Sequence, residues 1–287
     1  MPDLRELEQK LDSSRALQEI VQAMRNLAAI YVRRAEATLD AIRPYSDTTA
    51  TALGDVLERT GTVAGQHEGA DRCMVVALTG DQGLCGTYNE KVARAVETYR
   101  NALADATSLD VVVLGQRGRD LLRLRGIEPA LFIPSPSSLE GIRARMPQIA
   151  IDIFSFYLEQ GAGQLVFIYN AYEGMGHFSE QIRPVLPPER ELLEARLDPP
   201  FQVEPLLTAP AEELLGAMID EYFFIELYRA VLESHASENG ARLLSMTAAS
   251  SNIDERLADL TQAYQTVRQG AITAELLDVV GGAEALR

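Results

Sequence analysis

The segment SNIDERLADLTQAYQTVRQGA (251–271) carries the pattern that decides the architecture of this chain. Its apolar side chains alternate four and three residues apart, at Ile253, Leu257, Leu260, Tyr264, Val267 and Ala271. That spacing keeps one apolar seam on a helix, as a coiled-coil partner requires. Proline does not occur after Pro210, so the helix is free to extend for more than seventy residues. At 1.5 Å per residue such a helix is on the order of 100 Å long. We therefore expect it to lie against a partner helix, inside another protein, or both.

Residues 3 to about 58 carry a second seam of the same kind. Its residues stand near three-and-four spacing, with Ser14 filling one step and an irregularity around Ser14–Leu17: Leu4, Leu7, Leu11, Leu17, Val21, Met24, Ala28, Tyr31 and Ala35. We expect Pro44 to kink this helix or to end a turn near Ile42–Tyr45. A loop is predicted at Gly61, Gly65 and Gly69. Two long helices with apolar seams are expected to pair as an antiparallel coiled coil.

The middle third of the chain alternates between strand and helix patterns. Apolar, β-branched runs predict strands at 73–79, 110–115, 129–134, 164–172 and 180–186, and Pro184 favours an edge position for the last one. Helices are predicted at about 88–103 and 139–160, although Pro147 weighs against the second. The alternation predicts a small Rossmann-like α/β domain with a largely parallel sheet.

The expected domain organisation has three parts. They are an N-terminal coiled-coil helix (1–60), a central α/β domain (70–207) and a C-terminal coiled-coil helix (208–287). A stiff connector is expected before the last helix, where prolines stand at positions 187, 188, 199, 200, 205 and 210. Within it, residues 201–207 offer a last short strand.

Charge and composition limit the class of protein. The 287 residues carry a net charge of −16, which argues against nucleic acid as the main partner. One local basic cluster (Arg117, Arg119, Arg123 and Arg125) is interpreted as a solvated helix face in preference to a phosphate site. No apolar run has the length of a membrane span, and the N-terminus lacks the features of a signal or transit peptide. A bacterial cytoplasmic protein, whose mature form starts about where the sequence does, is therefore favoured.

The sequence gives little support for a catalytic, phosphate-binding or metal-binding site. The turn GDQGLCG (80–86) has neither the Gly-Lys-Ser/Thr ending of a Walker loop nor the GxGxxG spacing, so tight packing in a sharp turn is the favoured interpretation. Cys85 in this turn lacks a nearby histidine, and Cys73 is expected to be a small buried residue. Three scattered histidines (His67, His177 and His235) do not suggest a metal site. We expect no catalytic residue, cofactor or metal.

Four segments carry a resemblance to a known family. They are AMRNLAAIYVRRAE (23–36), LTGDQGLCGTYN (78–89), SENGARLLSM (237–246) and YQTVRQGAITAELLDVVGGAEAL (264–286). Together they resemble the gamma subunit of F-type ATP synthases. The resemblance implies a non-catalytic rotor shaft whose coiled coil enters the hexamer of alpha and beta subunits. Its α/β domain is expected to lie near the epsilon subunit and the c-ring of the membrane sector.

The resemblance also implies which residues contact partners. Arg268, Gln269, Thr273 and Glu275 match positions that contact loops of the beta subunit. Met24 and Arg242 match positions that face the beta lever region, with Arg25 supplying positive charge beside Met24. For Met24, a place in the coiled-coil core is an equally good interpretation. Gly281 and Gly282 would be explained by close approach to a surrounding sleeve.

Departures from the family pattern point to a divergent bacterial member. The chain has only two lysines, Lys10 and Lys91, where the family's N-terminal helix carries several, and Gly240 stands where the family more often has Ala or Ser. An alternative, sodium-type complex is compatible with these departures, and the location implied is peripheral, at the cytoplasmic face of the plasma membrane. Two other classes stay open: a phosphate-binding regulatory protein with a dimerisation stalk, and a free-standing coiled-coil scaffold.

Overall fold

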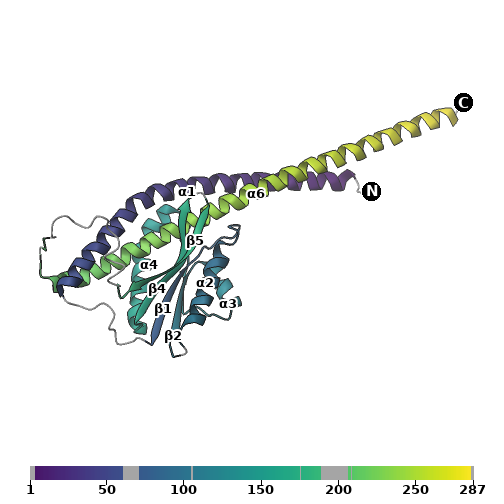
Figure 1. Ribbon diagram of the computed structural model, residues 1–287. Coiled ribbons are helices and arrows are strands. Elements are labelled where there is room, and N and C mark those ends of the chain that lie inside the picture. Colours follow the sequence, from purple (N-terminus) through teal and green to yellow (C-terminus); the bar gives the residue numbers. More distant parts are fainter. Residues whose placement is uncertain are drawn as a thin grey trace. The chain divides into compact units, whose positions relative to one another are not determined.

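The computed structural model describes residues 4–60, 71–104, 106–174, 176–188, 206–207 and 209–285 (Figure 1). The chain divides into two compact units. We call Ala28–Arg242 the sheet unit, and Met1–Leu27 together with Leu243–Arg287 the helix-pair unit. Two long helices, α1 (Leu4–Thr60) and α6 (Ala211–Ala285), contribute to both units. The 75 residues of α6 confirm the uninterrupted C-terminal helix that the sequence predicts.

The sheet unit contains a five-stranded sheet in the order β3-β2-β1-β4-β5. Its strands are β1 (Arg72–Leu78), β2 (Ser108–Leu114), β3 (Leu131–Ile133), β4 (Gln164–Gly174) and β5 (His177–Leu186). The first four are parallel, and β5 runs antiparallel to β4 at the edge, as Pro184 suggests. Three shorter helices connect the strands: α2 (Tyr88–Ala102), α3 (Gln116–Leu124) and α4 (Leu139–Gln160). The predicted α/β class is confirmed.

The sheet is covered on both faces, which explains why its strands read as continuous apolar runs. Alternate residues of β1 point to opposite faces. Met74, Val76 and Leu78 pack with residues of α1, α4 and α6, whereas Cys73, Val75 and Ala77 pack with residues of α2 and with Leu122 of α3. Cys73 is thus the small buried residue that the sequence predicts. The parts of α1 and α6 that lie in this unit form one layer of its core together with α4.

Pro44 and Pro147 do not end their helices. Of the two alternatives expected for Pro44, an end of a turn near Ile42–Tyr45 is wrong, because α1 continues to Thr60, and a kink stays a prediction. Helix α4 likewise runs through Pro147. A proline inside a helix frees the carbonyl four residues earlier, here that of Asp40 or Arg143. Both residues are exposed, so water can hydrogen-bond to the freed carbonyl.

The helix-pair unit packs the two seams against each other. Its segments of α1 and α6 run antiparallel (Figure 1), and Leu7 and Leu11 are buried between them. The C-terminal seam is half-buried from Ile253 to Val267, but Ala271, which the sequence also assigns to it, is exposed.

Leu17 does not belong to the seam. It is 54% exposed, and Gln18 takes its place, donating a hydrogen bond from Nε2 to Asp254 Oδ1 at 2.5 Å. With Gln18 included, the three-and-four spacing continues from Leu11 through Ser14 to Val21. The spacing of the seam is therefore regular, and the only unusual feature at this place is that a seam position carries a polar residue.

Some expectations lie outside the described residues. These are the loop at Gly61, Gly65 and Gly69, prolines 199, 200 and 205, and residues 201–205 of the proposed last strand. The two described residues of that strand, Leu206 and Leu207, are not in a strand.

Candidate functional site

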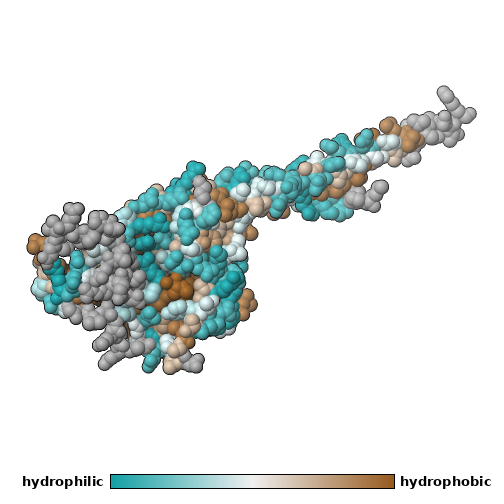
Figure 2. Space-filling view, in the orientation of Figure 1, coloured by the Kyte–Doolittle hydropathy of each residue, from teal (hydrophilic) through white to brown (hydrophobic). Residues whose placement is uncertain are grey.

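The candidate contact residues near the end of α6 share one exposed segment. Gln18 of α1 contacts Asp254 of α6, and the two helices run antiparallel. Leu4, the first described residue of α1, stands fourteen residues before Gln18, so it lies opposite a residue about fourteen positions after Asp254, near Arg268. Beyond that level α1 offers no described residue to pack against α6. All residues from 268 to 277 are exposed, including Ile272, Leu276 and Leu277, and Figure 2 shows hydrophobic surface close to this end of the helix.

This segment brings four of the sequence-predicted residues together: Arg268, Gln269, Thr273 and Glu275. The Thr273 hydroxyl donates to the Gln269 carbonyl at 2.9 Å, so it is satisfied within the helix despite the low helix propensity of threonine. Met24 and Arg25 are half-buried residues of the same unit, and this burial is compatible with both interpretations of Met24.

Arg242 lies in the sheet unit and is only 7% exposed. Its Nη2 donates to Glu238 Oε1 at 2.5 Å and to the Gly83 carbonyl at 3.4 Å, while Nη1 donates to Asn239 Oδ1 at 3.0 Å. These bonds join α6 to the glycine-rich turn. The sequence gives no sign of them, and a contact of Arg242 with a beta subunit stays a prediction.

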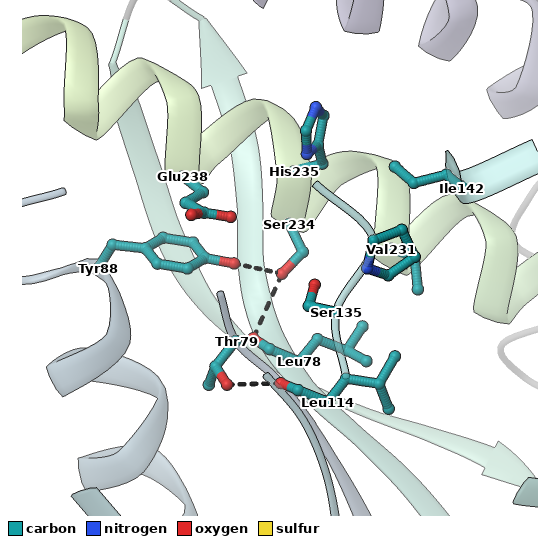
Figure 3. A pocket seen from close by; sticks show the side chains of 11 residues that line it. Leu78, Thr79, Tyr88, Leu114, Ser135, Ile142, Val231, Ser234, His235 and Glu238 are labelled. Atoms are coloured by element: carbon teal, nitrogen blue, oxygen red, sulfur yellow. Dashed lines mark hydrogen bonds between the residues drawn. The ribbon is translucent and has the colours of Figure 1, made fainter. Parts of the chain in front are cut away.

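A small polar pocket lies at the carboxyl ends of β1 and β2 (Figure 3). Tyr88 Oη and Ser234 Oγ are 2.6 Å apart, and Ser234 donates to the Leu78 carbonyl at 3.3 Å. The pocket has a volume of about 10 Å³, which is room for one water molecule. Small-molecule sites are typically at least about 300 Å³ in volume. The pocket therefore does not accommodate a nucleotide.

The polar groups of the turn GDQGLCG (80–86) form hydrogen bonds with other groups of the same chain. Asp81 Oδ1 accepts from the backbone amide of Gln116 at 2.7 Å, at the N-terminus of α3, and from the amide of Ser135 at 3.3 Å. Asn89 Oδ1 accepts from the Gly80 amide at 2.9 Å. A helix N-terminus that would suit phosphate is thus occupied by a carboxylate of the chain, which favours the packing interpretation of the turn.

Cys85 is not activated for nucleophilic chemistry. It is 2% exposed, and burial, followed by the charge of Glu238, raises the pKa of its thiol to about 11. A nucleophilic cysteine needs a thiolate near neutral pH. His235 is buried beside the polar pocket, and burial lowers its pKa to about 4, so it is neutral near neutral pH.

The basic cluster of α3 is mostly paired within the chain. Arg123 forms an ion pair with Glu128, Arg125 pairs with Glu90 and Glu97, and Arg119 stacks 4.2 Å from the Phe132 ring centroid. Only part of the cluster is the solvated face that the sequence suggests, since Arg125 is largely covered. These pairings leave little positive charge for a phosphate ligand.

The sequence interpretation missed a partly buried ion-pair network in the sheet unit. Arg229 pairs with Asp47 and Glu233, Arg43 also reaches Glu233, and Arg183 pairs with Glu226. It ties α1, α6 and β5 together. The sequence contains one hint of this network: Glu226 and Glu233 stand seven residues apart and therefore share a face of α6.

Metal binding and membrane crossing find no support among the residues that the structure describes. No three His, Cys, Asp or Glu side chains are grouped there as a metal ion would require. Likewise, none of the helices in the described ranges has the length and apolar character to cross a membrane.

A small α/β sheet unit and a pair of long antiparallel helices with an exposed helix end are typical of a stalk-type protein. A family model described as ATP synthase matches residues 3–286. The ATP synthase gamma chains of Geotalea daltonii and of a Methylobacterium species are each 30% identical to this chain, with full coverage of both sequences. The chain therefore belongs to the ATP synthase gamma chain family.

Solved structures share the fold. A chain of the Euglena gracilis mitochondrial ATP synthase, in a structure titled OSCP/F1/c-ring in rotational state 3, superposes with a TM-score of 0.69. It covers 99% of this chain and 94% of its own length at 16% identity. A chain of the Tetrahymena thermophila mitochondrial central stalk and c-ring gives a TM-score of 0.61 at 20% identity, covering 80% of this chain and 99% of its own. The mixed α/β fold with long terminal helices is thus shared with ATP synthase stalks.

Proposed function

We infer that this chain is the central rotor shaft, the gamma subunit, of an F-type ATP synthase. Its rotation couples ion flow through the membrane sector to ATP synthesis or hydrolysis at the beta subunits. Family membership over nearly the whole chain supports this function. The observation that carries the mechanical role is the end of α6, an exposed helix with apolar residues that no other described part of the chain covers.

A shaft acts by stabilising different partner conformations at different angles. A ligand shifts a conformational equilibrium only by its differential affinity for the states. An off-axis helix pair meets each beta subunit with a different face as it turns, so each beta subunit is stabilised in a different conformation. The shaft itself needs stiffness and asymmetric contacts, and it does not need a nucleotide pocket.

The partners proposed are the alpha and beta subunits, the epsilon subunit and the c-ring. Within the hexamer of alpha and beta subunits, we propose contacts through Met24, Arg25, Arg242, Arg268, Gln269, Thr273 and Glu275. The exposure of residues 268–277 supports the last four. For Arg242, burial against Glu238 means that a partner would meet it only at its remaining surface.

We propose that the three parts of the chain expected from the sequence have separate roles. Residues 1–60 and 208–287 form the shaft as a coiled coil, and residues 70–207 form the central domain. The complex would lie at the cytoplasmic face of a bacterial plasma membrane, with this chain attached peripherally. It would translocate either protons or sodium ions, because the ion is selected in the membrane ring and not in this subunit.

The test is purification of the complex from the native cell with this chain tagged. We expect alpha and beta subunits to co-purify, with one copy of this chain for every three beta subunits. Recovery of a symmetric dimer that binds nucleotide would favour the regulatory alternative. Recovery without alpha and beta subunits would overturn the rotor assignment.

The contact surface is tested by a matched pair of double variants in the same complex. Gln269→Ala with Thr273→Ala removes two proposed contact residues and one internal hydrogen bond. The control, Gln262→Ala with Thr266→Ala, removes the same residue types and an equivalent 2.9 Å bond seven residues earlier. We expect only the first variant to lower ATP synthesis driven by an ion gradient in membrane vesicles. Equal effects of the two variants would contradict a specific contact at residues 269 and 273.

A further inference from the structure

A carboxylate from α6 occupies the crevice of the sheet unit at which folds of this type bind ligands. The sheet order places β2 and β3 on one side of β1 and β4 on the other, so the connections reverse direction at the carboxyl end of β1. Open α/β sheets bind their ligands outside that switch point. Here the position beside the turn is taken by Glu238, with Ser234 one helical turn earlier (Figure 3).

The contact between Glu238 and Gly80 is a close one. A Cβ atom added at Gly80 would stand 2.5 Å from Glu238 Oε1 and 2.8 Å from Oε2. Only glycine leaves room for the carboxylate at this place. Glycines in dinucleotide-binding turns serve the same purpose, since they let a phosphate approach the backbone closely.

Arg242 supplies the cation of the same site. It is 7% exposed and Glu238 is 9% exposed, so neither charge is strongly hydrated. Besides its 2.5 Å bond to Glu238, Arg242 holds the Gly83 carbonyl, and its Nε atom has no partner among the described residues. Asp81, Cys85 and Tyr88 also face Glu238 electrostatically, and none of them is a cation.

We propose that this crevice is an anion-binding site that the chain fills with its own Glu238 carboxylate. The site consists of the Arg242 guanidinium and the space beside Gly80, whose amide already donates to Asn89 Oδ1. By filling it, Glu238 fastens α6 to the turn 80–86. Removal of one partner of a buried ion pair is strongly destabilising, because the other charge stays buried and unpaired. A chain without this carboxylate should therefore accept a small external anion in its place. This inference does not depend on the rotor assignment.

The experiment uses the full chain with Glu238→Ala, which deletes the carboxylate and leaves Arg242 and Gly80 in place. Thermal unfolding is followed in sodium formate, sodium phosphate and sodium chloride at equal ionic strength. We expect the variant to unfold at a lower temperature than wild type, and formate to raise its Tm saturably above the value in chloride. Rescue by phosphate as well would mean that the site also takes a tetrahedral anion.

Three comparisons make the result specific. Wild type should gain nothing from formate beyond chloride, because its site is filled. Glu255→Ala, which removes an exposed carboxylate of the same helix, should behave like wild type. The double variant Glu238→Ala with Arg242→Met should lose the formate effect. Equal Tm values of Glu238→Ala in all three salts would overturn the proposal.

A second variant covers the case in which Glu238→Ala does not fold. Glu238→Gln keeps the shape of the side chain and removes only its charge. We expect amide hydrogen exchange in residues 80–86 to become at least about tenfold faster, since the buried ion pair is broken. Unchanged exchange in this turn would overturn the proposal.

Discussion

His235 is a buried histidine that makes the sheet unit sensitive to acid. It is 5% exposed, its ring lies 5.9 Å from that of Tyr31, and Glu238 lines the same pocket. Burial, and then the charge of Arg242, lower its pKa from 6.5 to about 4. The unfolded chain therefore binds the proton more readily than the folded chain. This contribution to stability is complete above the unfolded pKa and is lost as pH falls from 6.5 towards 4.

We predict that His235→Gln reduces the loss of stability on acidification. A depression of the pKa of this size corresponds to about 3 kcal/mol of unfolding free energy once the pH is below the folded pKa. Urea denaturation at pH 7 and pH 4.5 should show a loss about 2 to 3 kcal/mol smaller in the variant than in wild type. Burial raises the pKa of Glu238, and its titration therefore acts in the opposite direction, but it is present in both proteins. Equal losses would contradict the assignment to His235.

At the scale of single residues, the sequence predicted which helix or strand a residue belongs to better than it predicted what the side chain contacts. It correctly located Cys73 in the core and the tip residues on a helix. It did not reveal that Arg242 is buried, because its partner Gly83 is 159 positions away in the chain. It also assigned Leu17 to the seam, where polar Gln18 stands. An apolar residue one position from a seam is indistinguishable from a seam residue until the partner helix is known.

At the scale of elements, two glycines of α6 differ in what surrounds them. Gly216 is exposed and has nothing within 4 Å of the position of an added Cβ. A Cβ at Gly240 would lie 3.0 Å from Gly176 Cα in the turn between β4 and β5. Gly240 thus has a local reason, because the helix passes close to backbone atoms of the turn there.

We predict that Gly216→Ala stabilises the protein by about 0.5 to 1 kcal/mol, because alanine favours the helix and restricts the unfolded chain. Gly240→Ala offers the same gain in helix propensity but meets backbone atoms, so it should be less stable than Gly216→Ala. Chemical denaturation of both variants and wild type measures the difference. A Gly240→Ala variant as stable as Gly216→Ala would show that the turn yields at no cost.

Secondary structure followed the sequence closely because its signals are local. The apolar runs predicted the five strands found in the described residues, and the absence of proline after Pro210 predicted the length of α6. The prediction that Pro44 ends a helical turn was wrong because the effect of a proline depends on whether water can reach the carbonyl group that it leaves without a partner. That exposure is a property of the fold, which the residues near Pro44 do not determine.

At the scale of the whole molecule, both thiols report on opening of the sheet unit. Cys73 and Cys85 are each 2% exposed, and burial raises the pKa of both. We predict that a thiol reagent at pH 8 labels the native chain slowly at both sites, in proportion to the fraction unfolded as urea is increased. Mass spectrometry of digested samples distinguishes the two cysteines. Fast labelling of either one without urea would contradict this prediction.

Which parts of the chain share a core could not be predicted. The sequence shows that α1 and α6 each have a buried face, but periodicity does not identify what covers that face. Leu39 and Leu53 of α1 and Phe223 of α6 belong to the core of the sheet unit. The helices therefore do two things that look alike in sequence: they pair with each other, and they complete the sheet unit.

The two edges of the sheet bear on whether one copy of the chain can pair with another through its strands. One edge is β3, which has only three residues and is followed directly by Pro134. The other is β5, in which Pro184 has no amide hydrogen and Glu180 carries an exposed charge. Short edges, proline and charge all hinder the addition of a strand from another molecule. Both edges are thus poor templates for another strand, which disfavours aggregation through the sheet.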